Sequence, residues 1–416
     1  MKVRALRANE MYKASAISAV AFEWGMDYLK EKAEQEAMTD AEIAEKEKIE
    51  IPEDPMPGEL FSRKIWAAMD DEENTVYGTV TVPVYTVRFD GHPCVMGGIG
   101  GVSTLPPYRR CGAIRECMRT ALKDMNENGF EFSYLYPFSY AYYRKFGYEN
   151  SAEVRQWDVK FTGLKKYGAP GSVEMLLPGS DFSVLTELYN KKYADYNLSV
   201  IRREFDGELK EKSLLEDKRY IYVWKNSSGE PRGFMIFRNN GGVMDCSNSF
   251  GNRGGFLALD AEAYMGLFDF AQTFAPNYHT IRFSASASVD LRSIINEENN
   301  VESKIFSGGM ARVVNVEKVL EKCRCKGSGS IVIAVTDPMA PWNEGSWKLT
   351  FGAENSVEAT DEAPDIETDI NTFTALICGF VDEENFELLR NFKVNNGEAP
   401  ISSVFYRKKS AVLDLF

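Results

Sequence analysis

Two adjacent arginines and a glycine, Arg109, Arg110 and Gly112, lie in the stretch PPYRRCGAIRECM, directly before an apolar pattern typical of a helix. The first backbone N–H groups of a helix have no partners within it, and the helix dipole places a partial positive charge there. Glycine lets a bulky ligand approach the backbone, and paired arginines neutralise negative charge. The stretch therefore predicts an anion site whose natural occupant is a pyrophosphate. The alternative is that both arginines merely sit on a surface turn.

A strand and a helix must position this turn. Residues 94–104 are typical of a strand, and apolar residues recur at spacings of three and four from Ile114 to Met125, which predicts a helix that Gly129 ends. Pro83 indicates an edge position or a bulge in its strand. The other expected elements are strands at residues 2–8, 64–70, 75–89, 130–138 and 152–161 and helices at residues 17–24 and 139–147. This order predicts an α/β domain.

Two later changes in composition divide the rest of the chain. Residues 163–172 resemble a linker, and beyond them a hairpin around residues 226–229 and a strand and helix at residues 254–274 repeat the order of the first domain without a basic glycine turn. A second change lies near residue 308, after which short strands and helices are expected, one helix at residues 384–392. The predicted domains are residues 1–158, 159–307 and 308–416.

Composition argues against several classes of function. A net charge of −14 disfavours nucleic acid as a partner, because binding to a phosphate backbone needs a cationic face, and it suits a cationic acceptor better. No apolar run reaches about 18 residues, so no membrane span is expected. Seven cysteines without a CxxC pair and an N-terminus without an apolar signal core indicate the reducing cytoplasm. With two histidines, His92 and His279, neither a metal cluster nor a histidine-dependent triad is expected.

The residues around the arginine turn resemble a known family. GVSTLPPYRRCGAIRECM is similar to the acetyl-CoA signature of the GNAT superfamily of N-acetyltransferases, with Arg109 and Gly112 matching and Ile114 departing at the last position. The pair LPPYRRCGAIR and YYRKFGYE resembles more specifically the enhanced intracellular survival (Eis) family. The resemblance implies an α/β (α+β) chain with an active GNAT domain, a degenerate second GNAT-like domain and a C-terminal sterol-carrier-like domain.

The resemblance also implies acetyl-CoA as co-substrate and no metal. The pantetheine arm would pair with main-chain groups of Val102 and Thr104. The pyrophosphate would lie on the arginine turn, formed by Arg109, Arg110, Cys111, Gly112, Ala113 and Ile114. Cys111 would contribute its backbone there. The alternative is a nucleophilic thiol, favoured by the helix N-terminus, although direct transfer from CoA needs no acyl-enzyme.

Direct transfer needs an oxyanion site, an acid and a base. A main-chain N–H near Val102 could serve the oxyanion, and Tyr143 matches the tyrosine acid of the family. In this family the free carboxylate of the last residue, here Phe416, enters the site of the first domain. Its ordinary pKa of about 3.3 to 3.7 suits an amine poorly, but desolvation in an aromatic pocket would raise it. The alternative is a tail that only packs.

The acceptor implied by the resemblance is a primary amine of a cationic molecule such as an aminoglycoside, or a lysine side chain. Glu23, Trp24 and Asp27 are the expected acceptor-binding residues, although each could equally be a solvated or packed helix residue. A homo-hexamer is also implied. Two other functions stay open: a non-catalytic lipid or small-molecule carrier with a vestigial acetyltransferase site, and an acyltransferase for longer acyl groups.

Overall fold

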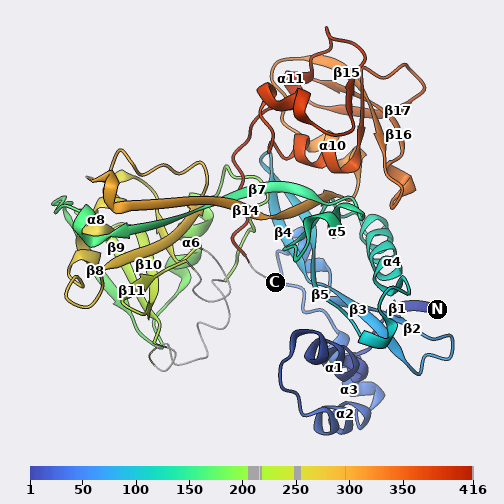
Figure 1. The fold of residues 1–416 in the computed structure, drawn as a ribbon, viewed down its shortest axis with the longest axis horizontal. Coiled ribbons are helices and arrows are strands. Elements are labelled where there is room, and N and C mark those ends of the chain that lie inside the picture. Colours follow the sequence, from blue (N-terminus) through green and yellow to red (C-terminus); the bar gives the residue numbers. More distant parts are fainter. Residues whose placement is uncertain (205–214, 216–217, 248–253, 296, 415–416) are drawn as a thin grey trace. The chain divides into compact units, whose positions relative to one another are not determined.

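The computed structural model describes residues 1–204, 215, 218–247, 254–295 and 297–414, and the chain divides into two compact units. The first unit joins residues 1–151 to residues 309–407, and the second contains residues 152–308 and the described tail from Lys408 onwards. Two long strands, β7 (Glu149–Lys160) and β14 (Val301–Val313), carry the chain from one unit into the other (Figure 1). The chain is a mixture of helices and strands, which confirms the predicted fold class.

A mixed sheet forms the base of the first unit. Its strands follow the order β1, β2, β3, β5, β6 and β14, and β4 also pairs with β5. β5 and β6 run parallel, whereas β3 and β14 pair antiparallel with their neighbours in this order. The remaining bounds are β1 (Lys2–Ala5), β2 (Lys64–Met69), β3 (Val76–Val82), β4 (Val84–Phe89), β5 (His92–Thr104) and β6 (Phe132–Leu135).

Two helices, α1 (Met11–Phe22) and α4 (Ala113–Glu127), cover opposite faces of this sheet. Successive side chains of a strand point to opposite faces, and β2 shows this alternation. Ala67 of β2 packs in one cluster with Ile17 of α1, whereas the next residue, Ala68, packs in another with Cys117 of α4. The shorter helices of this part are α2 (Tyr28–Glu36), α3 (Asp40–Glu47) and α5 (Tyr140–Arg144).

Pro83 divides the strand that the sequence predicts over residues 75–89. It separates β3 from β4, because proline has no N–H for the ladder, and its carbonyl oxygen accepts a bond of 2.8 Å from the Gly98 N–H. The sequence predicts an edge position or a bulge at Pro83 within one strand, and the structure has a break between two strands instead. β4 then turns into β5 through Asp90 and Gly91, both with positive φ (50° and 95°), which is the backbone of a tight hairpin.

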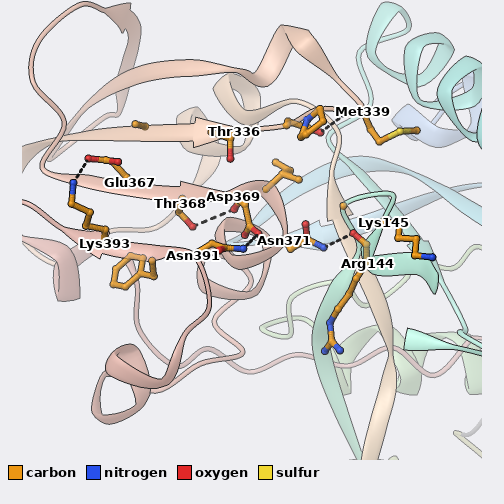
Figure 2. Close-up of a pocket in the computed structure, with 16 residues that line it drawn as sticks. Arg144, Lys145, Thr336, Met339, Glu367, Thr368, Asp369, Asn371, Asn391 and Lys393 are labelled. Atoms are coloured by element: carbon orange, nitrogen blue, oxygen red, sulfur yellow. Dashed lines mark hydrogen bonds and ion pairs between the residues drawn. The ribbon is translucent and has the colours of Figure 1, made fainter. Parts of the chain in front are cut away.

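The C-terminal part of the first unit is a second sheet with helices on it. Its strands follow the order β17, β16, β15, β18 and β19. Residues 384–392 do not form the predicted α-helix, since the structure has a 3-10 helix over Glu383–Leu388. A cavity of about 690 Å³ lies beside β15, β18 and α10 (Figure 2). The bounds are α9 (Val316–Lys322), β15 (Gly329–Thr336), β16 (Gly345–Phe351), β17 (Ser356–Thr360), β18 (Ile366–Asp369), α10 (Ile370–Ile377), β19 (Phe392–Val394) and α11 (Ile401–Val404).

The second unit repeats part of this plan. Its strands continue in the order β14, β7, β13, β11, β10, β9 and β8, and β12 pairs with β10. The predicted hairpin and the predicted strand and helix are both present, as β9–β10 and as β12 followed by α8. Within the described residues no helix is long and apolar enough to cross a membrane. The bounds are β8 (Gly171–Leu176), α6 (Ser183–Lys192), β9 (Tyr220–Asn226), β10 (Pro231–Asn240), β11 (Val243–Asp245), β12 (Phe256–Ala258), α8 (Ala261–Gln272) and β13 (Thr280–Ser286).

Candidate active site

The arginine turn leads directly into α4. Gly112 is the N-cap residue of that helix, with φ 91°, and no side chain accepts a hydrogen bond from the first turn. A Cβ atom at Gly112 would meet no heavy atom within 4 Å, so the space in front of the helix end is open. Arg109, Arg110 and Cys111 are exposed, and neither arginine forms an ion pair with a described residue. Free N–H groups, the helix dipole and two guanidinium groups thus meet at one place, which suits a pyrophosphate.

In the second unit the corresponding helix is α8, and a side chain caps its N-terminus. The N-cap residue of α8 is Asp260, whose carboxylate accepts a bond of 2.9 Å from the Ala263 N–H. The same carboxylate forms an ion pair with Arg232. A carboxylate therefore already occupies the place where an anion would bind, and it would repel one. At the start of α8 this arrangement therefore disfavours the binding of an anion.

β5 extends beyond the end of its parallel neighbour, β6, just before the arginine turn. β6 pairs with β5 only over Met96–Ile99, whereas β5 continues to Thr104. On the other side β3 stays paired with β5 as far as Thr104, with a register shift between Thr79 and Thr81. Val102 and Thr104, the residues expected to meet a pantetheine arm, both lie in this segment without β6. Strand-like hydrogen bonding to an extended ligand is therefore open to them.

A cavity of about 670 Å³ lies on the α1 side of the same segment of β5. Gly100 and Gly101 of β5 line it, together with Trp24 and with hydroxyl-bearing side chains of α1, β3 and β4. Arg63, just before β2, is the charged residue among its described lining residues, and it forms no ion pair with a described residue. The hydroxyl-bearing residues are Ser15, Ser18, Thr81 and Tyr85.

Of the three expected acceptor-binding residues, only Trp24 is among the described residues that line this cavity. Glu23 is exposed and ends α1 in the left-handed conformation, with φ 58°. Asp27 is also exposed, and its carboxylate accepts a bond of 3.2 Å from the Lys30 N–H as the N-cap of α2. Glu23 and Asp27 are therefore not among the described residues that line this cavity, and their expected role in acceptor binding stays a prediction.

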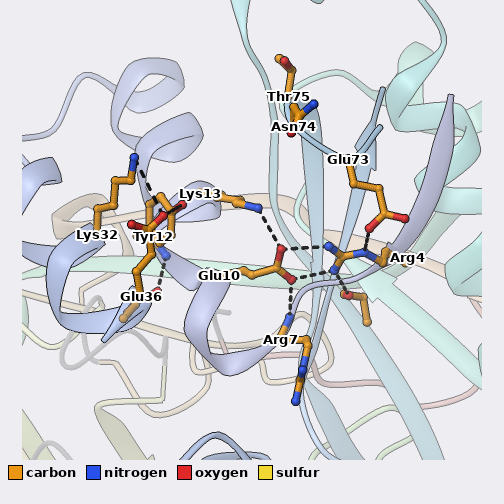
Figure 3. Close-up of polar contacts among 12 residues, drawn as sticks. Arg4, Arg7, Glu10, Tyr12, Lys13, Lys32, Glu36, Glu73, Asn74 and Thr75 are labelled. Carbon is orange, nitrogen blue, oxygen red and sulfur yellow. Dashed lines mark hydrogen bonds and ion pairs between the residues drawn. The ribbon is translucent and has the colours of Figure 1, made fainter. Parts of the chain in front are cut away.

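An ion-pair network fixes the start of α1, the helix that forms one wall of the cavity (Figure 3). Arg4 of β1 donates to both carboxylate oxygens of Glu10 at 2.7 and 2.9 Å and to Glu73 at 2.7 Å. Lys13 donates to the same Glu10 carboxylate at 2.8 Å. The hydrogen bonds from Arg4, above all, lower the pKa of Glu10 from 4.5 to about 2. Tyr12 joins α1 to α2 through a bond of 2.9 Å from its hydroxyl to Glu36.

Tyr143 lies on α5, on the other side of β5. Its side chain is buried, at 3% exposure, in the cluster against which Val102 also packs. Burial raises the pKa of Tyr143 above its ordinary value of 10, so the hydroxyl keeps its proton throughout the physiological range. No described residue forms a hydrogen bond with that hydroxyl. A protonated hydroxyl near β5 that has no described hydrogen-bond partner can donate a proton, and the same burial makes it a weaker acid than a solvated tyrosine.

Phe416 lies outside the described residues, so its expected role as base stays a prediction. The tail before it belongs to the second unit. Asn197 donates to the carbonyl of Lys409 at 2.8 Å and accepts from the N–H of Ala411 at 3.0 Å. The Asp414 carboxylate accepts a bond of 3.2 Å from the hydroxyl of Tyr189 and forms an ion pair with Arg202.

Sequence reasoning missed two kinds of residue. Arg63 belongs to no motif, and its relevance comes only from the fold, which places it beside α1 and β5. The side chains that hold the end of α5, above all Asn371, lie more than 160 residues away in the sequence and could not be found from local spacing. Before the structure, only pairs of positions that co-vary among homologous sequences could have indicated such long-range contacts.

Two family models match parts of the chain. Residues 2–151 match that of the acetyltransferase (GNAT) domain. This part of the chain is similar to a GNAT acetyltransferase domain. Residues 316–409 match the model of the sterol carrier protein domain. The family models thus confirm the predicted GNAT domain at the N-terminus and the sterol-carrier-like domain at the C-terminus.

Solved structures agree over the whole chain, although sequence identity is low. A protein from Enterococcus faecalis described as a probable N-acyltransferase is 21% identical, with a TM-score of 0.81 and coverage of 100% of this chain and 99% of that one. A GCN5-related N-acetyltransferase from Anabaena variabilis is 18% identical, with a TM-score of 0.78 and full coverage of both chains. Eis1 from Mycobacterium abscessus is 17% identical, with a TM-score of 0.73 and coverage of 100% and 99%. The chain has an Eis-like fold. No curated protein matches its sequence.

Proposed function

We propose that the GNAT domain transfers an acetyl group from acetyl-CoA to a primary amine. The observation that carries the proposal is the uncapped N-terminus of α4, with Arg109 and Arg110 beside it and β5 free of β6 in front of it. This combination offers a binding place for a pyrophosphate and for an extended arm in line with it. The Eis-like fold supports the same assignment, because relatives with this fold are described as acyltransferases.

The transfer is a direct displacement in which each group has one task. The neutral amine nitrogen forms a bond to the thioester carbon, and a main-chain N–H near Val102 stabilises the oxyanion. The C–S bond then breaks, and Tyr143 donates its hydroxyl proton to the thiolate sulfur. The proton that the amine nitrogen loses goes to a base, for which the resemblance proposes the terminal carboxylate of Phe416. The tyrosinate regains its proton from solvent.

The first candidate acceptor is a cationic amine, such as an aminoglycoside or a lysine side chain. The net charge of −14 supports it, because a molecule with a net negative charge attracts cations. A second class, amines that also carry a carboxylate, is favoured by Arg63 in the described lining of the cavity beside Trp24. Lysine and cadaverine form a matched pair, since they share the amine and differ by the carboxylate. Activity on lysine that falls to the cadaverine level in Arg63→Ala would favour the second class.

Thiol release from acetyl-CoA in the presence of a panel of amines tests the proposal, with acetyl-CoA binding followed separately by calorimetry. Binding together with amine-dependent thiol release is the expected result. Binding without thiol release on any amine would leave the acetyl-CoA site standing and remove the transferase assignment. No heat of binding would instead favour the carrier function of the C-terminal domain. Longer acyl-CoA donors in the same assay separate an acetyltransferase from an acyltransferase of broader range.

A homo-hexamer and a cytoplasmic location are further proposals, and both rest on the resemblance and on composition. Sedimentation of the purified chain gives its mass in solution. If the chain is a monomer at concentrations where it releases thiol fully, the proposed hexamer is wrong, whereas the proposed acetyl transfer is unaffected.

A further inference from the structure

The helix that carries Tyr143 is too short to stand alone. α5 spans only Tyr140–Arg144, and isolated helices need about 12 to 15 residues to be even marginally stable in water. Its N-terminal end is held locally, because the Ser139 hydroxyl accepts a bond of 3.4 Å from the Tyr142 N–H. Its other end passes through Gly147, with φ 84°, into β7. The position of Tyr143 therefore depends on what holds this second end.

The sterol-carrier-like domain supplies one of the groups that hold it. The side-chain amide of Asn371, in the first turn of α10, donates to the carbonyl oxygens of Arg144 at 3.0 Å and Tyr148 at 2.9 Å. Figure 2 shows the bond from Asn371 to Arg144 across the space between α10 and the end of α5. One side chain thus bridges two carbonyls on either side of Gly147, of which that of Arg144 ends the helix.

A buried ion pair holds the carbonyl between these two. Arg312 of β14 donates at 2.5 Å to the carbonyl oxygen of Phe146, and its guanidinium also donates to both oxygens of Asp337 at 2.7 and 2.5 Å. Both side chains of the pair are fully buried. Asp337, which follows β15, is fixed in turn by a bond of 2.9 Å from the side-chain amide of Asn343. Three hydrogen bonds, to the carbonyls of residues 144, 146 and 148, therefore reach this turn from side chains outside residues 2–151, the part that the GNAT family model matches.

We propose that the sterol-carrier-like domain completes the active site by fixing this turn, with Asn371 as a positioning residue for Tyr143. The inference rests on the proposed role of Tyr143 as proton donor. Because no described residue forms a hydrogen bond with the Tyr143 hydroxyl, its direction is set only by its ring packing and by the backbone of α5. A change in the anchored turn therefore moves the hydroxyl directly. Asn371 does not touch the reacting atoms.

A double-mutant cycle tests this. Kinetic constants are measured for the full-length protein, Asn371→Ala, Tyr143→Phe and the variant with both changes. Asn371→Ala is expected to lower kcat roughly tenfold, with little change in KM for acetyl-CoA, since a displacement of about 1 Å can cost a factor of a hundred in rate. In the Tyr143→Phe background the same change is expected to have no effect, because there is no hydroxyl left to position.

A matched control separates positioning from loss of stability. Asn395 lies in the same domain and also donates to a backbone carbonyl, that of Pro364 at 3.0 Å, but it makes no bond to the turn. Asn395→Ala is expected to keep full kcat. If Asn371→Ala melts below the assay temperature, Asn371→Ser replaces it, because serine keeps a small polar side chain in the first turn of α10.

Three other outcomes of the double-mutant cycle would each contradict one part of the proposal. Equal loss of kcat from Asn371→Ala with and without the tyrosine hydroxyl would show a general structural effect and refute positioning. An unchanged kcat in Asn371→Ala, with Tyr143→Phe impaired, would also refute it while leaving the proton donor in place. Full activity of Tyr143→Phe would instead remove the proposed role of Tyr143, on which the inference rests.

Discussion

Two glycines with nearly the same backbone conformation should respond very differently to alanine. Gly112 and Gly147 have φ values of 91° and 84°, so each substitution carries the cost of a left-handed alanine, about 1 kcal/mol. At Gly112 the new Cβ atom meets nothing within 4 Å. At Gly147 it would lie 1.5 Å from Nη1 and 2.7 Å from Cζ of Arg312, which must then leave Phe146 and Asp337. Breaking a buried pair costs about 3 to 5 kcal/mol.

The difference can be measured by thermal melting of the full-length variants. For a unit of this size, 1 kcal/mol corresponds to about 2 to 4 °C in the melting temperature. Gly112→Ala is expected to lower the transition of the first unit by only a few degrees, and Gly147→Ala by about 10 °C or more. Gly112→Ala should in addition weaken acetyl-CoA binding, which calorimetry reports. Equal decreases in melting temperature for the two variants would refute the reasoning, since only one of them displaces Arg312.

Three further predictions concern the proposed chemistry and helix α1, which forms one wall of the cavity beside Trp24. Tyr143→Phe should lower kcat about a hundredfold in the thiol-release assay with an unchanged melting temperature, because its hydroxyl has no described partner; unaltered kcat would contradict this. Changing Arg109 and Arg110 together to alanine should raise the Kd for acetyl-CoA about tenfold at low salt and less at high salt, as calorimetry at two ionic strengths would report. The pKa of Glu10 falls from 4.5 to about 2 on folding, so its contribution is present above about pH 4.5 and is lost as pH falls towards 2. Glu10→Gln should therefore cost about 1 to 2 kcal/mol at pH 7, allowing for solvent screening, and much less near pH 2.5, as denaturation at the two pH values would show.

Local features of the site could be predicted from the sequence, because their causes are local. The arginine turn, the start of α4 and the break at Pro83 each follow from one or two residues whose backbone preferences are strong. The helix expected at residues 384–392 was wrong for an equally physical reason. Most of Glu383–Leu388 is exposed, so favourable composition there has no buried face to stabilise a full helix.

Features that depend on contacts between distant segments could not be predicted. Arg63 lines the cavity beside α1, whereas Glu23 and Asp27 are not among its described lining residues, because Glu23 ends α1 in the left-handed conformation and Asp27 caps α2. No residue spacing in the sequence predicts that α1 ends at Glu23 or that Asp27 caps α2. The bonds from Asn371 to the end of α5 likewise join two domains that different family models describe. The predicted GNAT domain is thus correct as a pattern, but its proposed active site depends on residues beyond residue 308.

The passage of β14 back into the first sheet has a consequence for biosynthesis. β6 is made early, yet its antiparallel neighbour, Met310–Val313, leaves the ribosome only after residues 152–308 of the second unit. Until then β6 is an open edge, which is the kind of surface that chaperones cover and that other chains can add to. The turn over residues 144–148, which follows Tyr143, gains its bonds from Asn371 later still, when that residue has been made. A nascent chain, or one stopped by a premature termination codon before that point, would already contain every residue of the acetyl-CoA signature and still lack a finished catalytic turn.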